Sequence, residues 1–299
     1  MASRAKTAAG PILACEILPD RVLAARVAPL GSHIEVHTAR QLPAGAVAPS
    51  LVNPNIADSN AVSSAITDAL AGVGGGRSRD VIAIVPDAAV RIVLLDFDAL
   101  PESRGEAAGM IRFRLKKSLP FDVEKAVISF HARNSGANVK VVASVALASI
   151  IHEYEDVFVR AGYAPGVVLP STLAALGTVD AARPTLVLKV AEQTVTVAIV
   201  DQHELRLFRT LDFASSAAGP TRLIEEVYPS LVFFEDQFGS HVERVLVAGQ
   251  SSARELAPVL GSHTRAPIED LVAARHVSGG LSGVNHSGPL AGVVGALLA

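Results

Sequence analysis

The chain has 299 residues, of which half are hydrophobic and 18% are charged, and its formal net charge is −3 at pH 7. This length and apolar content predict one or two folded domains with a sizeable core, and they exclude a largely disordered chain. The slight negative charge, the aromatic content of 4% and the absence of tryptophan argue against a nucleic-acid-binding surface. No apolar run approaches the ~20 residues that span a bilayer, so we expect any membrane association to run through a partner.

Three strands are predicted first, followed by a helix and two buried strands. The strands fall at 12–18, 22–28 and 33–42, the helix at 59–71, and the two buried strands at 80–86 and 90–97. Turn residues such as Pro19-Asp20 separate the first strands, which favours a β-meander. Cys15, the only cysteine, lies within the first strand, so we expect a buried free thiol.

His33, Glu35 and His37 alternate along the third strand and therefore share one face of it. Such a pattern can ligate zinc. Neighbours on one strand face are ~7 Å apart, so a third ligand from elsewhere would be needed. We therefore expect a polar face in contact with solvent, and no metal site.

The middle of the chain is well ordered but carries no cluster of reactive side chains. A helix is predicted within 101–121, where Ser103 and Glu106 have capping-box spacing. Cations gather near its end, where they suit the helix dipole; they are Arg112, Arg114, Lys116 and Lys117. They are either a solvated helix end or a contact for an acidic partner, and Arg112 and Lys116 are the candidate partner-binding residues. A strand, a turn, a second strand and a helix then run to Gly162.

The pattern of three strands and a helix repeats from Pro184. Strands are predicted over 185–190, 194–201, 204–213 and 244–248, and helices over 220–238, 252–260 and 288–299. The first of these helices contains Pro229, which predicts a kink. The repeat predicts two related α/β lobes, and such a duplication normally has a ligand cleft between its halves.

Several segments resemble one known family, in order and over nearly the whole chain. They read "LPFDVEKAVISFHA", "VKVVASVALASIIHEYEDVFVRAGYAPGVVLPSTLAAL" and "EEVYPSLVFFEDQFGSHVERVLVAGQSS". This order is similar to that of the PilM family of type IV pilus assembly proteins. These proteins are relatives of the cell-division protein FtsA in the actin/hexokinase/Hsp70 superfamily. "GSHIEVHTARQLPAGAV" and "PLAGVVGALLA" also resemble segments of the family.

The resemblance implies a two-lobed actin-like α/β fold. The first lobe would span 1–180 and the second 181–299. A small α+β subdomain would be inserted in the first lobe at about 100–162, and the C-terminal helix 288–299 would pack back on that lobe. In this family the inserted subdomain helps to form a groove for a partner peptide. A binding surface of this kind needs no catalytic side chains.

The resemblance also places the two turns that hold phosphates in actin-like ATPases. Such turns have the form Asp-x-Gly, because glycine lets backbone N–H groups approach the phosphate and the carboxylate positions Mg²⁺. The first turn falls on "CEILPDRV", where Glu16 takes the acidic position but Leu18 and Pro19 stand in place of small residues. In the second turn, "LKVAEQTV", Lys189 replaces the aspartate and Ala191 the glycine.

These departures predict a damaged nucleotide cleft. The candidate nucleotide contacts are Glu16, Lys189, Gly249, Gln250 and Ser251, the last three from the adenosine-side segment "VLVAGQSS". A lysine in place of a carboxylate reverses the charge that metal-assisted phosphoryl transfer requires. We therefore expect no catalytic residues and no bound ATP or Mg²⁺. The alternative, in which Lys189 contacts a phosphate directly, keeps nucleotide binding open.

The expected function is that of a non-catalytic scaffold, a pseudo-ATPase, in a type IV pilus or related secretion platform. By resemblance it is cytoplasmic, is held at the inner membrane by its partners, and binds the cytoplasmic tail of a PilN-like protein and other assembly components. One alternative is an active actin-like ATPase or kinase with altered phosphate turns. Another is the L-type cytoplasmic protein of type II secretion, which continues into a transmembrane helix, so that the full-length gene would discriminate.

Overall fold

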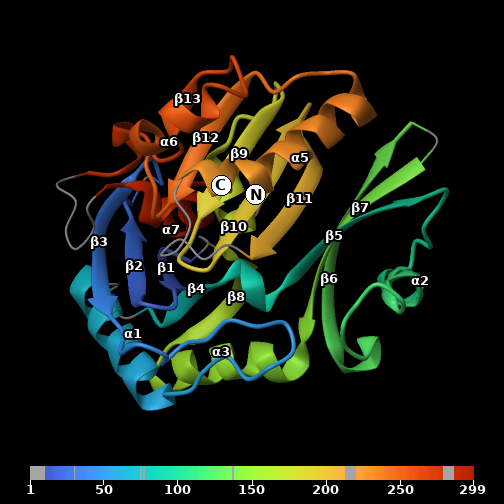
Figure 1. Cartoon of the computed structure of the whole chain (residues 1–299). Coiled ribbons are helices and arrows are strands. Elements are labelled where there is room, and N and C mark those ends of the chain that lie inside the picture. Colours follow the sequence, from blue (N-terminus) through green and yellow to red (C-terminus); the bar gives the residue numbers. More distant parts are fainter. Residues whose placement is uncertain are drawn as a thin grey trace, which may run out of the picture.

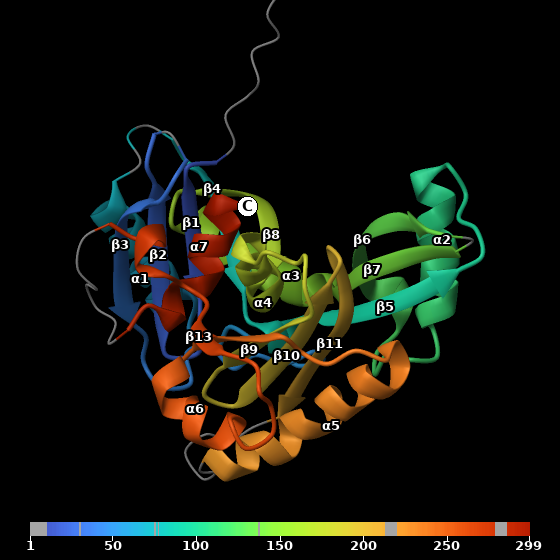
Figure 2. The same ribbon diagram turned by 90° about the horizontal axis from the view of Figure 1, so that it is seen from above.

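The computed structural model describes residues 11–299 apart from 30, 75, 77, 137, 213–219 and 279–285. Two five-stranded sheets form two lobes, and a three-stranded sheet projects at one side (Figures 1 and 2). The strand orders are β3-β2-β1-β4-β8, β11-β10-β9-β12-β13 and β5-β7-β6. The chain therefore has the two-lobed α/β architecture that its repeated pattern predicted.

The first lobe begins with an antiparallel meander and ends with parallel strands. Its strands are β1 (Leu13–Ile17), β2 (Arg21–Val27), β3 (Ile34–Gln41), β4 (Asp80–Val85) and β8 (Ala164–Pro170). β4 is parallel to both β1 and β8. Helices α1 (Ser59–Val73) and α3 (Ala148–Arg160) cover one face of this sheet. The apolar residues of α1 recur at three- and four-residue spacing, so that one face of the helix is buried.

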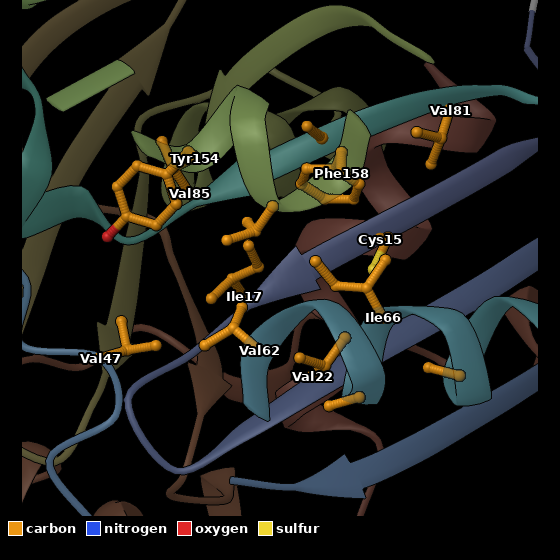
Figure 3. Close-up of a cluster of buried hydrophobic side chains, with 14 of the residues drawn as sticks. Cys15, Ile17, Val22, Val47, Val62, Ile66, Val81, Val85, Tyr154 and Phe158 are labelled. Atoms are coloured by element: carbon orange, nitrogen blue, oxygen red, sulfur yellow. The ribbon is translucent and has the colours of Figure 1, made fainter. Parts of the chain in front are cut away.

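The core under α1 and α3 contains the single cysteine (Figure 3). Cys15 on β1 is fully buried and free, as expected. It packs in one cluster with Ile66 of α1 and Phe158 of α3. Burial raises the pKa of the thiol above its usual range, with a smaller contribution from the neighbouring Glu16 carboxylate. The thiol is therefore a small apolar core group rather than a nucleophile.

The second lobe repeats this arrangement. Its elements are β9 (Thr185–Val190), β10 (Thr194–Asp201), β11 (Glu204–Asp212), α5 (Pro220–Phe238), β12 (Arg244–Gly249), α6 (Ala253–Leu260) and β13 (Ile268–Asp270). Helices α5 and α6 pack on one face of the sheet. α5 continues through Pro229. This proline is exposed, so water can reach the Glu225 carbonyl that loses its helical N–H partner.

The C-terminal helix joins the lobes. α7 (Ala291–Leu298) packs against β1, β2 and α4 (Ser171–Ala175), all of which belong to the first lobe. Its buried residues share a core cluster with Val187 and Leu246 of the second lobe. Figure 2 shows α7 beside the first sheet, above the second.

The small sheet has different limits from those expected. It comprises β5 (Arg91–Phe97), β6 (Ala126–Ser135) and β7 (Asn138–Leu147), with α2 (Arg104–Leu115) on one face. It thus begins before residue 100. α3 was expected within it, but the apolar side chains of this helix, including Tyr154 and Phe158, are buried in the first-lobe core. Burial of that face fixes α3 on the large sheet.

The expected solvent face of β3 was wrong for His37. This side chain is 6% exposed, and burial lowers its pKa below the ordinary value. The reason is that His37 lies opposite Ala25 of β2 and so shares its sheet face. That face packs under α7. In the part of the chain that the structure describes, no three His, Cys, Asp or Glu residues are grouped to hold a metal ion. No helix in that same part is long and apolar enough to cross a membrane.

Candidate functional site: the cleft and the groove

A buried ion pair crosses the cleft between the lobes. Glu16 lies near the end of β1 and Lys189 near the end of β9. The Lys189 ammonium donates to Glu16 Oε1 at 2.8 Å, and the two side chains are 5% and 0% exposed. The Ser171 hydroxyl, at the start of α4, donates to Glu16 Oε1 and accepts a hydrogen bond from Lys189. The sequence predicted both charged residues for this place, but not that they would neutralise each other.

α7 closes the cleft behind this pair. A Cβ added to Gly292 would lie 2.3 Å from Glu16 Oε2, so only glycine permits the helix to approach this closely. Glu16 Oε2 is buried and has no hydrogen-bond partner among the described residues. The carboxylate therefore depends on Lys189 and Ser171, and loss of the Lys189 cation would leave Glu16 as an uncompensated buried ion.

A second polar link joins the lobes beside the first. Asp87 follows β4, is 8% exposed, and accepts hydrogen bonds from the Thr172 N–H at 2.8 Å and from Thr196 Oγ1 at 3.0 Å. Thr196 belongs to β10 of the second lobe, so Asp87 spans the cleft. Sequence analysis missed these residues. A signal was present, because polar residues directly after the carboxyl ends of parallel strands, as in "DVIAIVPD" and "VVLPST", often build sites.

The two turns are closed on themselves. The N–H of Leu18 donates to Arg21 O at 2.8 Å, and the N–H of Ala191 donates to Thr194 O at 2.8 Å. Pro19 has no N–H to offer. These backbone donors therefore satisfy their own hairpins and do not point at a ligand.

The hollows at the turns are small. Leu18, Pro19, Lys189 and Ala191 line two cavities of about 50 and 30 Å³. Pockets that hold ligands of drug size are about 300–1,000 Å³. The cavities are therefore too small for a nucleotide, and the backbone donors of the turns are already bonded. Lys189 is not available for a phosphate either, because Glu16 neutralises it. Glu16 in turn is not free to support Mg²⁺.

The other candidate nucleotide residues serve the packing of the second lobe. Gly249 ends β12 with φ +85°, and a Cβ there would lie 2.0 Å from Val190 O. The N–H of Gln250 donates to the same carbonyl at 2.7 Å. Ser251 is half-buried and precedes the Ser252 N-cap of α6. The structure brings Lys189, Gly249 and Gln250 to the rim of the smaller cavity, while Ser251 lies outside its lining.

A larger open space lies between the small sheet and the second lobe. Two hollows of about 350 and 440 Å³ share Arg91, Ile92 and Phe208, so they form one continuous depression, which we call the β5 groove. The other lining residues include Pro49, Ser50, Leu51, Val52, Leu94, Ser118, Pro120, Arg209, Thr210, Asp212 and Phe233. Its inner end adjoins the larger cleft cavity, since both are lined by Pro49, Asp87, Ala88 and Thr194. β5 and β11 each pair with one strand in the described residues. The groove thus lies along two sheet edges that retain backbone donors and acceptors.

One wall of the β5 groove is fixed by a buried asparagine. The loop 49–52 precedes Asn55, which is fully buried and donates to Ser50 O at 2.9 Å. Tyr154 of α3 donates to Asn55 Oδ1 at 3.0 Å. Glu153 accepts from the Asn55 N–H at 2.6 Å. The loop is therefore tied to α3 rather than free in solvent.

The candidate partner-binding cations lie apart from the cleft. Arg112 donates to the carbonyl groups of Val123 and Ala126 at 3.4 and 3.3 Å, within the small subdomain. It also lies 3.9 Å from Glu124. Lys116 is exposed at the end of α2. Arg112 thus has a structural use, and Lys116 remains on the surface.

Comparison with solved structures gives the same architecture. The PilM-PilN type IV pilus biogenesis complex matches with a TM-score of 0.78 and 18% identity, over 96% of this chain and 97% of that chain. The cytoplasmic domain of EpsL, an inner membrane component of the type II secretion system of Vibrio cholerae, matches with a TM-score of 0.55 and 10% identity, over 96% and 94%. EutJ, an ethanolamine utilization protein from Carboxydothermus hydrogenoformans, matches at 0.53 and 9%, over 97% and 90%.

No model of a known protein family matches the sequence, and no curated protein matches it either. The sequence identity to the solved structures is low, so the similarity shows the fold alone. The chain therefore has the two-lobed actin-like fold that its sequence predicted, in an arrangement similar to that of the PilM structure.

Proposed function

We propose that this chain is a non-catalytic scaffold of a type IV pilus or related secretion platform, and that it binds the cytoplasmic tail of a PilN-like inner-membrane protein. The observation that carries the proposal is the buried contact between Glu16 and Lys189 at 2.8 Å. It occupies the place where the fold would hold phosphates. A scaffold has no need of that place, whereas an ATPase depends on it.

The β5 groove supports a peptide as the ligand. Its accessible surface combines the apolar Val52, Leu94 and Phe233 with the cations Arg91 and Arg209. An extended peptide gains backbone hydrogen bonds at a sheet edge and side-chain contacts in the hollows beside it. The groove therefore suits an extended tail that carries apolar residues and a carboxylate.

The structural comparisons favour one machine over another. Coverage of this chain is 96% for both the PilM-PilN complex and the EpsL domain, but the TM-scores are 0.78 and 0.55. One fold can host many functions. The higher TM-score therefore only makes the pilus component the first candidate and the secretion component the second, and the argument for peptide binding rests on the groove. An L-type secretion component is the second candidate, supported by the EpsL likeness.

The test is direct binding of a fluorescent peptide that corresponds to the cytoplasmic tail of a PilN-like protein from the same organism. Fluorescence anisotropy is expected to show saturable binding. Leu94→Glu places a charge in the β5 groove and Phe233→Ser removes an apolar anchor, so each should weaken binding by about 30-fold or more. Val159→Ser is the matched control, because Val159 is 62% exposed on α3 and outside the groove lining.

Three results would contradict the proposal: no binding by the wild-type chain, equal binding by the groove variants, or hydrolysis of ATP by the purified protein. A tail from an EpsL-type partner, tested in parallel, separates the two candidate machines. Circular dichroism and thermal unfolding of each variant show whether a lost signal reflects a lost fold.

A further inference from the structure

The outer face of α2 carries an exposed aromatic ring, Phe113. Phe113 is 81% exposed, more than any other large apolar side chain described, and Met110 is 40% exposed. The other exposed aromatic side chains have a neighbour: Tyr228 lies beside His263, Phe238 lies under Arg206, and Phe233 lines the β5 groove. Among the described residues, Phe113 makes no ring contact of this kind.

The exposed residues form one stripe along the helix. Met110, Phe113 and Arg114 are spaced at i, i+3 and i+4, so they lie on one side of α2. Lys117 lies in the turn that directly follows the helix. The opposite side packs on the small sheet through Ala107, Ile111 and Leu115. Figures 1 and 2 both place α2 at the outer edge of the molecule, beyond the small sheet. The stripe is therefore convex and projects into solvent.

Positive charge surrounds the ring. Arg114, Lys116 and Lys117 are exposed, and none of them has an ion-pair partner in the part of the chain that is described. On the same helix, Glu106 lies in the first turn, away from these cations. The net charge of −3 for the whole chain therefore hides a local basic surface. We call the set of Met110, Phe113, Arg114, Lys116 and Lys117 the α2 patch.

We infer that the α2 patch contacts an anionic lipid surface, with the Phe113 ring among the acyl chains and the cations at the headgroups. A convex face with one aromatic ring and flanking cations is the pattern of an interfacial contact. A protein partner would offer a pocket for the ring and carboxylates for the cations, and it is the competing occupant in the test. Charge complementarity between the three exposed cations and anionic lipid, together with the projection of the 81% exposed ring into solvent, favours the bilayer.

The position of the patch agrees with the β5 groove. Ser118 and Pro120 line the groove and directly follow Lys117 in the chain. A tail anchored in the bilayer and seated in the groove would hold the patch close to lipid. This geometric step rests on the proposed function, but lipid binding by the isolated chain does not.

The contact is expected to be weak alone. Each cation near an anionic surface contributes about fivefold in affinity, and burial of the ring contributes about tenfold. A single short stripe then gives only partial binding in free solution. A membrane-anchored partner would raise the effective concentration of lipid near the patch and so increase the occupancy of the contact.

Sedimentation of the full chain with vesicles tests the inference without any partner peptide. Vesicles of phosphatidylcholine mixed with phosphatidylglycerol should bring down the protein at low salt, and vesicles of phosphatidylcholine alone should not. Arg114→Glu/Lys117→Glu should weaken binding by about 25-fold or more, and Phe113→Ser by about tenfold. Arg254→Glu/Arg265→Glu changes the net charge equally at exposed positions of the second lobe, and Val159→Ser removes an exposed apolar group elsewhere; both controls should bind as the wild type does.

The inference is overturned if the wild-type chain ignores anionic vesicles, or if the patch variants and the controls bind alike. It is also overturned if the patch variants keep lipid binding but lose an acidic protein partner. Because no tail peptide is present, failure here leaves the tail-binding result unaffected. Unchanged thermal unfolding of the variants confirms that the surface substitutions left the fold intact.

Discussion

The cleft between the lobes and the β5 groove are both spaces between sheets, but they differ in what satisfies their polar groups. In the cleft, Glu16 and Lys189 are buried and form an ion pair. The N–H groups of the two turns donate hydrogen bonds within their own hairpins. In the groove, Arg91 and Arg209 are exposed on β5 and β11, each of which pairs with one strand among the described residues. A site that already satisfies itself gains little from a ligand. This difference is why we propose the groove beside the small sheet, rather than the cleft, as the binding site.

Loss of the buried cation is the largest effect we predict for the cleft. Lys189→Ala leaves Glu16 charged and buried, and the free energy of unfolding should fall by about 3–5 kcal/mol. Urea denaturation measures it. Glu16→Gln/Lys189→Met, which removes both charges, should recover most of the loss. Lys140→Ala is the matched control, because its 2.9 Å pair with Asp96 is exposed and should contribute less than about 1 kcal/mol. Equal losses of stability for the two lysine variants would show that the buried ion pair contributes no more than the exposed one.

A methyl group at Gly292 tests how tightly α7 closes the cleft. The new Cβ would meet the Glu16 carboxylate at 2.3 Å, and Gly292→Ala should therefore cost about 1–3 kcal/mol of stability by overpacking. Gly109→Ala in α2 meets nothing within 4 Å and should be neutral or stabilising by up to about 1 kcal/mol. Thermal unfolding compares the two. A neutral Gly292→Ala would show that the cleft has room to relax.

The groove wall should be sensitive at Asn55. Asn55→Ala leaves the Ser50 carbonyl and the Tyr154 hydroxyl without their partner, at a cost of about 1–3 kcal/mol. Because loop 49–52 lines the groove, tail binding should weaken as well, as anisotropy would show. Asn53→Ala, at an exposed position of the same loop, should change stability by less than about 0.5 kcal/mol. A loop that keeps full peptide affinity without Asn55 would not be a fixed wall.

The smallest effect is a pH dependence outside both regions. Burial lowers the pKa of His37 below the ordinary 6.5, so the unfolded chain takes up a proton before the folded chain does. Stability is therefore expected to fall as the pH drops from about 7 through the lowered folded pKa. His276 acts in the same direction, through burial first and then through Arg275. His37→Gln should flatten the slope between about pH 7.5 and 5.5 in urea titrations; an unchanged slope would refute the assignment.

Local patterns predicted most of the fold. The strands Thr185–Val190 and Thr194–Asp201 and the helix Pro220–Phe238 begin and end where turn residues and periodicity placed them. The assignment of α3 to the inserted subdomain was wrong, because its apolar face suits either sheet until the tertiary arrangement is known. His37 was misplaced for the same reason, since its sheet face packs under α7, which comes from the far end of the chain.

The candidate site was predicted in part. Glu16 and Lys189 were both assigned to the cleft, but their contact joins residues 173 positions apart. No local pattern reports such a pairing. The charge reversal at Lys189 was interpreted as damage to a metal site or as a direct phosphate contact, whereas in the structure Lys189 is half of an inter-lobe ion pair. Asp87 and Thr172 were missed, although their places after β4 and β8 carried a usable signal.

Calorimetric titration of the purified chain with Mg-ATP tests the central claim most directly. A cleft that satisfies its own charges should give no binding heat up to millimolar nucleotide. The double variant Glu16→Gln/Lys189→Met is titrated in parallel, to show whether nucleotide binding changes when both charges of the ion pair are removed. Saturable micromolar binding by the wild-type chain would contradict the account and return the cleft, rather than the groove, to the centre of its function.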